Sequence, residues 1–128
     1  MANTAQTPSQ NAQNVVKLFQ GEPLDFNVTG GNTAITTAGV TVVKAANADL
    51  RYYVTGFEFF NNSATIATVF NILDGATVIW VGNLPAVTGQ IIVELTTPIR
   101  GSINTALNIQ AVTTLANVYW NVKGYLGV

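Results

Sequence analysis

A chain of 128 residues is long enough for one domain with a single hydrophobic core, and only 9% of its residues are charged. Five basic and six acidic side chains leave a formal net charge of −1, and the basic residues are scattered, so binding to a nucleic-acid backbone is not expected. Cysteine and histidine are both absent, which excludes a disulfide framework, a Cys/His zinc site and catalysis by a Cys–His or Ser–His pair.

The first 20 residues are predicted to form an extended, flexible N-terminal arm, followed by a single β-sandwich domain over residues 21–128. Residues 1–14 carry no side-chain charge and almost no large apolar side chain, so they cannot bury enough apolar area to offset the entropy lost on ordering. The arm is either a frayed terminus or a docking arm that orders on a neighbour, with a short helix over residues 11–20 as a further alternative. Its apolar candidate partner contacts are Val15, Val16, Leu18 and Phe19.

The arm also lacks the basic and apolar regions of a secretory signal peptide. No apolar run in the chain reaches the roughly 18–20 residues that a membrane-spanning helix needs. We therefore expect a protein made in the cytoplasm without a signal peptide, with no membrane partner.

From residue 24 onward, short segments rich in Val, Ile, Thr, Phe and Tyr alternate with turn residues, a pattern typical of β-strands. Asp74-Gly75, between two apolar segments, is the strongest hairpin signal in the chain. Gly30-Gly31-Asn32 and Asn61-Asn62-Ser63 are likewise predicted turns, because Gly and Asn tolerate turn conformations. The predicted strands cover residues 24–29, 40–45, 50–61, 65–74, 76–84, 90–95, 106–112 and 117–126.

Several of these strands alternate apolar and polar side chains with a period of two. In the last strand, Val118, Trp120 and Val122 are predicted to face the core, whereas Tyr119 and Tyr125 face outward. Burial of one face on consecutive short strands indicates an antiparallel sheet rather than a parallel α/β sheet. About eight strands in roughly 105 residues predict an all-β, antiparallel β-sandwich that is jelly-roll-like, with an immunoglobulin-like sandwich as the alternative.

No motif predicts catalysis, a cofactor or a metal ion. Glu58, inside an aromatic run, is the strongest candidate for chemistry, and a carboxylate pair of the glycosidase type stays open because two acids can meet in the fold. The alternative is a strand residue that faces solvent or pairs with Arg51 or Arg100. No segment has the ligand spacing of a calcium loop, and Gly30-Gly31 is not followed by the Gly-Lys-Ser/Thr of a phosphate-binding loop. We therefore predict a non-enzymatic protein with no catalytic, cofactor-binding or metal-binding residues.

The aromatic residues allow two interpretations. One is a sugar-stacking platform, as in lectins, and the other is a set of core and interface anchors that bury about 150–250 Å² each. Trp80 and Trp120 fall in the middle of predicted strands rather than in loops, which favours packing. Tyr119 and Tyr125, on the polar side of the last strand, predict an aromatic stripe on the outer face and are candidate subunit contacts.

Residues 50–128 contain a set of strand-and-turn patterns: Arg51-Tyr52-Tyr53-Val54-Thr55-Gly56-Phe57, the turn Asn61-Asn62-Ser63-Ala64, Ile72-Leu73-Asp74-Gly75, Val78-Ile79-Trp80, and a segment over residues 97–110 that begins Thr97-Pro98-Ile99-Arg100-Gly101. In these patterns the chain resembles small virion proteins of tailed bacteriophages. The most similar type is the head decoration, or cement, protein that clamps the outer capsid surface.

The resemblance implies a homotrimeric β-sandwich at three-fold or quasi-three-fold positions, bound to the major capsid protein, with no small-molecule substrate. We therefore expect a virion structural protein that binds the outer surface of a phage capsid and stabilises it. A charged fraction of 9%, against roughly 25% in an average soluble domain, fits either a surface that is buried against partners or one that is covered by uncharged Thr, Asn and Gln side chains. Tail-fibre and adhesin tips of phages have similar sandwich domains, so a tip domain that binds a host-surface glycan is the alternative.

Overall fold

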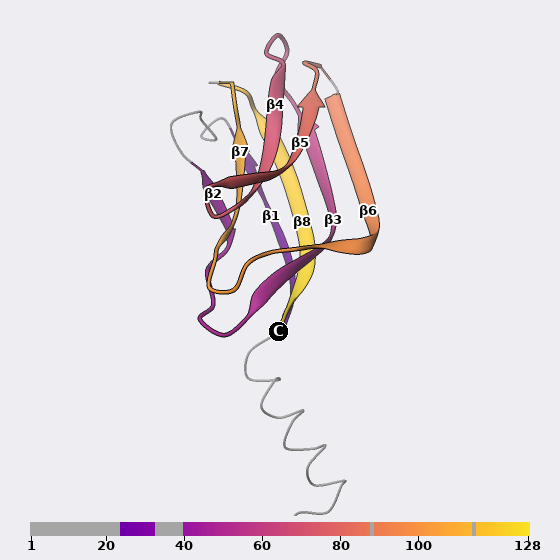
Figure 1. The fold of residues 1–128 in the computed structure, drawn as a ribbon. Helices are drawn as coiled ribbons and strands as arrows, with labels where there is room; N and C mark the ends of the chain where they lie inside the picture. Colours follow the sequence, from indigo (N-terminus) through magenta and orange to yellow (C-terminus); the bar gives the residue numbers. More distant parts are fainter. Residues whose placement is uncertain (1–23, 33–39, 88, 114) are drawn as a thin grey trace, which may run out of the picture.

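The computed structural model describes residues 24–32, 40–87, 89–113 and 115–128, and this part of the chain is all-β (Figure 1). Its strands are β1 (Asp25–Asn32), β2 (Thr41–Lys44), β3 (Arg51–Asn61), β4 (Thr68–Asp74), β5 (Thr77–Leu84), β6 (Gly89–Arg100), β7 (Leu107–Ala111) and β8 (Val118–Gly127). Within these ranges no helix is long and apolar enough to cross a membrane. The predicted arm, with Val15, Val16, Leu18 and Phe19, lies outside the described residues.

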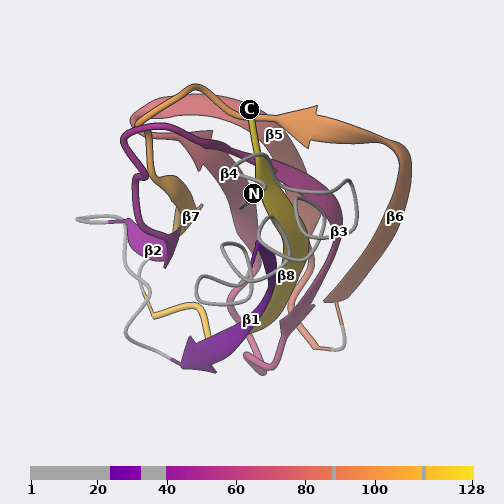
Figure 2. The same cartoon turned by 90° about the horizontal axis from the view of Figure 1, so that it is seen from below.

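The strands form two antiparallel four-stranded sheets, in the orders β1-β8-β3-β6 and β2-β7-β4-β5 (Figures 1 and 2). Each strand of the first half of the chain pairs with a counterpart from the second half: β1 with β8, β2 with β7, β3 with β6 and β4 with β5. A long hairpin that is closed at the β4–β5 turn and rolled into two sheets has this pairing, and it is the jelly-roll arrangement. Of the two predicted sandwiches, the jelly roll is therefore confirmed.

The core lies between the two sheets and contains a cluster of aromatic rings. Phe59 of β3 packs against Phe70 of β4 with ring centroids 4.1 Å apart. Phe57, also on β3, meets Trp80 of β5 edge-on at 4.6 Å. These contacts cross from one sheet to the other, so burial of aromatic side chains holds the sandwich together.

The predicted alternation of β8 is confirmed. Val118 and Val122 are completely buried, and Trp120 between them is 6% exposed. Tyr119 and Tyr125 lie on the opposite, outer face of the same strand. The mid-strand position of Trp120 thus reflects packing in the core, as the sequence predicts.

β1 is longer than predicted, and the prediction of a turn at Gly30-Gly31 is wrong. Both glycines lie within β1 and pair with Trp120 and Tyr119 of β8. A Cβ atom at Gly30 would lie 2.7 Å from the Trp120 ring, and one at Gly31 would lie 2.4 Å from the Val118 carbonyl oxygen. Glycine is needed here because β1 passes so close to β8, not because the chain reverses direction.

β6 is also longer than predicted, since it continues to Arg100 instead of ending near residue 95. Pro98 lies inside it, although proline lacks the backbone N–H that a strand uses for pairing. β6 is an edge strand, with only β3 as a neighbour in its sheet, and an edge strand tolerates proline. The prediction of its end is wrong because the sequence does not reveal which strands lie at an edge.

The predicted turn after β3 is confirmed and depends on the side chain of Asn61. This residue is completely buried, and its Oδ1 accepts a hydrogen bond from the Ser63 N–H at 3.0 Å. Its Nδ2 donates to the carbonyl oxygens of Ile66 at 2.8 Å and Leu84 at 3.3 Å. One amide side chain therefore satisfies backbone groups of three residues, two in the β3–β4 loop and one at the end of β5, at this corner of the sandwich.

The predicted hairpin at Asp74-Gly75 is also confirmed, and Asp74 has a further role. Its Oδ1 accepts hydrogen bonds from the Tyr52 hydroxyl at 2.6 Å and the Ser102 N–H at 3.1 Å, and its Oδ2 accepts one from the Ser102 hydroxyl at 2.6 Å. Burial, with the hydrogen bond to Asp74, raises the pKa of Tyr52 far above its ordinary value. Burial alone would raise the pKa of Asp74, but the hydrogen bonds from Ser102 and Tyr52 outweigh it and lower this pKa. Asp74 thus ties β4 to β3 of the other sheet.

Candidate functional site

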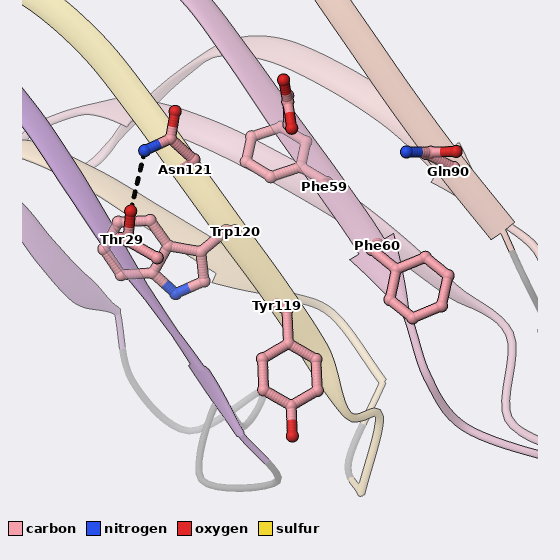
Figure 3. A pocket seen from close by; sticks show the side chains of 8 residues that line it. Thr29, Phe59, Phe60, Gln90, Tyr119, Trp120 and Asn121 are labelled. Carbon is pink, nitrogen blue, oxygen red and sulfur yellow. Dashed lines mark hydrogen bonds between the residues drawn. The ribbon is translucent and has the colours of Figure 1, made fainter.

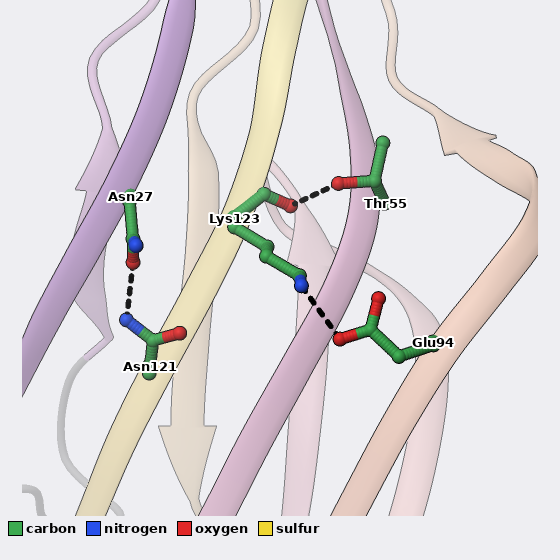
Figure 4. Close-up of polar contacts among 5 residues, drawn as sticks. All are labelled: Asn27, Thr55, Glu94, Asn121 and Lys123. Atoms are coloured by element: carbon green, nitrogen blue, oxygen red, sulfur yellow. Dashed lines mark hydrogen bonds and ion pairs between the residues drawn. The ribbon is translucent and has the colours of Figure 1, made fainter.

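In the described ranges, the acidic side chains do not gather into a metal-binding cluster. No group of three or more of them is placed to hold a metal ion. Glu58 faces solvent from the outer face of β3 and makes no ion pair with any described residue, Arg51 and Arg100 included. In the described ranges, the one ion pair joins Lys123 Nζ to Glu94 Oε1 at 2.6 Å (Figure 4). Of the predicted alternatives for Glu58, the solvent-facing strand residue is the one observed.

Aromatic side chains occupy one end of the outer face of the sheet β1-β8-β3-β6. Tyr119 of β8 lies opposite Phe60 of β3, and Phe60 lies opposite Gln90 of β6 (Figure 3). Tyr119 is 47% exposed, Phe60 is half-buried and Gln90 is exposed. Opposed positions in antiparallel strands have Cβ atoms about 4.5–5.5 Å apart, so these three side chains form one continuous row.

The adjacent row on the same face contains three polar side chains and ends on β6 at Ile92, which lies opposite Glu58 and is 58% exposed. Asn121 of β8 lies between Thr29 of β1 and Glu58 of β3. The Asn121 amide donates hydrogen bonds to Thr29 Oγ1 at 2.8 Å and to Asn27 Oδ1 (Figures 3 and 4). The amide nitrogen is therefore engaged within the sheet, whereas the Glu58 carboxylate makes no hydrogen bond to another described residue.

The two rows border a shallow depression of about 200 Å³. The side chains outside the core that line this depression belong to Thr29, Glu58, Phe60, Gln90, Tyr119 and Asn121. Phe59 and Trp120 also line it, but both belong to the buried core. Pockets for drug-sized ligands are about 300–1,000 Å³, so this depression suits a single small ring and not a large cofactor.

Tyr125, the second predicted outer-face contact, lies at the other end of the same face. Its ring stacks on Tyr53 of β3 with centroids 4.9 Å apart and planes 12° apart. The Tyr53 hydroxyl donates a hydrogen bond to the Val128 carbonyl oxygen at 2.6 Å. Tyr119 and Tyr125 thus share a face, as predicted, but they do not form one site, because Tyr125 is half-buried against Tyr53 and lies away from the depression.

The outer face of the second sheet, β2-β7-β4-β5, exposes valine side chains that the sequence analysis does not single out. We call this set the valine face: Val42 (54% exposed), Val69 (36%), Val78 (45%), Val81 (58%) and Val112 (41%). Between them lie uncharged amide side chains of Asn71, Asn83 and Gln110. The alternation of each strand is visible in the sequence, but jelly-roll pairing brings these valines together from segments far apart in the chain.

The two outer faces differ in charge. Strands β2, β7, β4 and β5 contain two charged residues, Lys44 and Asp74, and both are in register with Leu107 at one end of the sheet. The four strands of the other sheet contain six charged residues. The valine face is therefore almost uncharged, with valines and amides interspersed, whereas the opposite face combines aromatic, aliphatic, amide and ionised groups.

No protein-family model, curated protein or solved structure matches the chain. The class that the structure defines is a jelly-roll β-sandwich whose two sheets differ in charge, with two charged residues in the strands of one and six in the strands of the other.

Proposed function

We propose that the protein is a non-enzymatic virion structural protein that binds the outer surface of a phage capsid as a homotrimer and stabilises it as a cement or decoration protein. The resemblance of residues 50–128 to head decoration proteins supports this function, and jelly rolls occur among viral capsid proteins as well as lectins. The observation that carries the proposal is the valine face, a sheet surface with five exposed valines and almost no charge, on a chain with 9% charged residues.

The valine face has the properties of a protein–protein contact. Exposed apolar side chains that gather on one face are unfavourable in water and are typical of interaction sites, and the uncharged amides between these valines can form hydrogen bonds to a partner. Valine loses little side-chain entropy when it is fixed, and complete burial of its side chain contributes about 1.5–3 kcal/mol. We assign this face to the contact between sister subunits. Three linked subunits then need few capsid contacts each, because linked binding raises avidity by roughly 10²–10⁴.

Sedimentation velocity of the full chain and two lysine variants tests this assignment. Val81→Lys introduces a charge on the valine face, and Ile92→Lys introduces one on the outer face of β6. The two wild-type side chains are equally exposed, at 58%, so the variants are matched. We expect trimers for the wild type and for Ile92→Lys, and monomers for Val81→Lys. A monomeric wild type, or identical behaviour of the two variants, contradicts the assignment.

Binding to the capsid is tested separately by co-sedimentation with purified phage heads assembled without this protein. The wild type is expected to pellet with the heads and to raise the temperature at which they open. Val81→Lys is expected to pellet weakly, because a monomer loses the avidity of three linked subunits. A wild-type protein that stays in the supernatant contradicts the capsid-binding function.

A second candidate function, a tail-fibre or adhesin tip domain that binds a host-surface glycan, is favoured by a different observation. The depression beside Tyr119 combines an exposed aromatic ring with amide and carboxylate groups. Binding to a glycan array together with a position on the tail would support this function over the first. The two candidates therefore differ in where the protein is located in the virion.

A further inference from the structure

We propose that the depression beside Tyr119 binds one neutral pyranose ring of a glycan, with the ring stacked on Tyr119 and its hydroxyls held by Glu58, Gln90 and Asn121. The inference gives a ligand class and a site to the second candidate function. It is independent of capsid binding, since the valine face lies on the other sheet.

The aromatic part of the site is already arranged for stacking. Tyr119 is 47% exposed, so a large part of this aromatic side chain is accessible to a ligand. Phe60, directly opposite it on β3, is half-buried and supports the apolar end of the depression (Figure 3). A pyranose has an apolar face of C–H groups that packs on such a ring, while its hydroxyls remain at the edge.

Polar groups lie where the edge of the stacked ring would reach. Glu58 and Asn121 occupy the row next to Tyr119 and Phe60, and Gln90 flanks Phe60 on β6. The Glu58 carboxylate and the Gln90 amide make no hydrogen bond to other described residues, so both are available to a ligand. An ionised carboxylate accepts hydrogen bonds from two neighbouring hydroxyls, and an amide both donates and accepts.

The hydrogen bond that Asn121 donates to Thr29 fixes the orientation of its amide. With the nitrogen held by the sheet, the amide carbonyl is the group left for a ligand hydroxyl (Figure 3). A polar group that is preoriented in this way loses little entropy on binding.

The charges on this face favour a neutral sugar over an acidic one. Glu58 is negative and unpaired among the described residues, so a carboxylate or phosphate on the ligand would be repelled. The nearest basic side chain on β8, Lys123, lies one row beyond Asn121 and is engaged with Glu94 at 2.6 Å. Arg100 is in register with Tyr53, at the opposite end of the face. Among the described residues of this face, neither Lys123 nor Arg100 is therefore placed to form an ion pair with an acidic sugar in the depression.

The size and depth of the depression set the expected affinity. About 200 Å³ of shallow space accommodates one ring and leaves its far side in solvent. Such a contact is weak on its own, and several subunits on one particle would raise the effective affinity for a surface that displays many copies of the sugar. We expect millimolar binding of a monosaccharide to the isolated protein.

The test uses isotope-labelled full-length protein titrated with the methyl glycosides of glucose, galactose, mannose and N-acetylglucosamine, and with N-acetylneuraminic acid as the acidic comparator. Chemical-shift changes at residues 58–60, 90 and 119–121 would locate the ligand. Tyr119→Ala is expected to weaken binding by about tenfold through loss of the stacking surface. Glu58→Gln is expected to weaken it by about fivefold, because a neutral amide accepts weaker hydrogen bonds than a carboxylate.

Tyr125→Ala is the matched control, since it removes a tyrosine from the same face of the same strand away from the depression. It is expected to bind the neutral glycosides as the wild type does. The inference is overturned if no neutral glycoside binds, if only N-acetylneuraminic acid binds, or if Tyr119→Ala and Tyr125→Ala have equal affinity. None of these outcomes alters the trimer or the capsid co-sedimentation, which are measured without sugar.

Discussion

Replacing Asp74 by asparagine removes the charged acceptor that joins the two sheets. In the wild type this carboxylate accepts hydrogen bonds from the Tyr52 hydroxyl and from the backbone and side chain of Ser102. Asparagine keeps one acceptor oxygen and places an NH₂ donor where the second oxygen was, so the three hydrogen bonds cannot all be retained. Tyr52 is 1% exposed, and water does not easily replace its lost partner.

The size of the effect follows from these contacts. A hydrogen bond to a charged group contributes about 1.5–3 kcal/mol, against about 0.5–1.5 kcal/mol for a neutral pair. Ser102 is exposed, so water compensates for much of its loss and the Tyr52 bond accounts for most of the change. We expect Asp74→Asn to lower the free energy of unfolding by about 2 kcal/mol. For a domain of this size, that corresponds to a fall in Tm of about 6–10 °C.

The effect depends on pH in a defined direction. Hydrogen bonds lower the pKa of Asp74 in the folded protein, whereas an unfolded chain has an Asp pKa of about 3.9. The stability that the carboxylate adds is therefore complete above about pH 4, and it is lost as the pH falls through the lower pKa of the folded state. The difference between wild type and Asp74→Asn should shrink in that acidic range.

Urea unfolding monitored by tryptophan fluorescence measures both effects, at about pH 7 and about pH 3. Asp49→Asn is the control, because Asp49 is exposed and its carboxylate makes no hydrogen bond to another described residue. The control should change the unfolding free energy by less than about 0.5 kcal/mol. Equal midpoints for Asp74→Asn and Asp49→Asn, or a difference that does not depend on pH, would refute the assigned role of Asp74.

Three further predictions concern a close approach of two strands, a core side chain and a surface ion pair. Gly31→Ala should destabilise the fold by more than about 2 kcal/mol, because φ is 134° and a Cβ would lie 2.4 Å from the Val118 carbonyl oxygen. A Cβ at Gly127 would come no closer than 3.1 Å, to the Tyr53 ring, so Gly127→Ala should cost less in the same urea unfolding measurement. Phe59→Ala should lower the unfolding free energy by about 3–5 kcal/mol, since the ring is 1% exposed, and a loss below about 1 kcal/mol would contradict its place in the core. Lys123→Met breaks the ion pair with Glu94, whose two side chains are 41% and 65% exposed. It should change the free energy of unfolding by less than about 1 kcal/mol and abolish most of the dependence of that free energy on salt concentration.

Much of the fold can be predicted from the sequence because the local signals and the tertiary structure agree. Alternation in β8 separates the buried Trp120 from the exposed Tyr119, and Asp74-Gly75 marks the central hairpin of the jelly roll. The ends of β1 and β6 are not predictable in the same way. Gly31 has the composition of a turn but serves a close approach to β8, and Pro98 is tolerated only because β6 is an edge strand.

The candidate surfaces are harder to predict, because they depend on which strands are neighbours. Outward orientation of Tyr119 follows from alternation, but its place beside Phe60 and near Gln90 follows from the register of β3 with β8 and β6. The valine face combines residues of β2, β4, β5 and of the segment after β7, which a local pattern does not connect. Pairing between distant segments is set by burial of the whole core, and a single sequence does not state it.

Cryo-electron microscopy of phage particles assembled in the presence of this protein tests the proposed function most directly. We predict trimers of the jelly roll on the outside of the head, with Val81 and the rest of the valine face covered by neighbouring subunits. A protein found on the tail, or a head-bound protein whose valine face is open to solvent, would contradict the proposal.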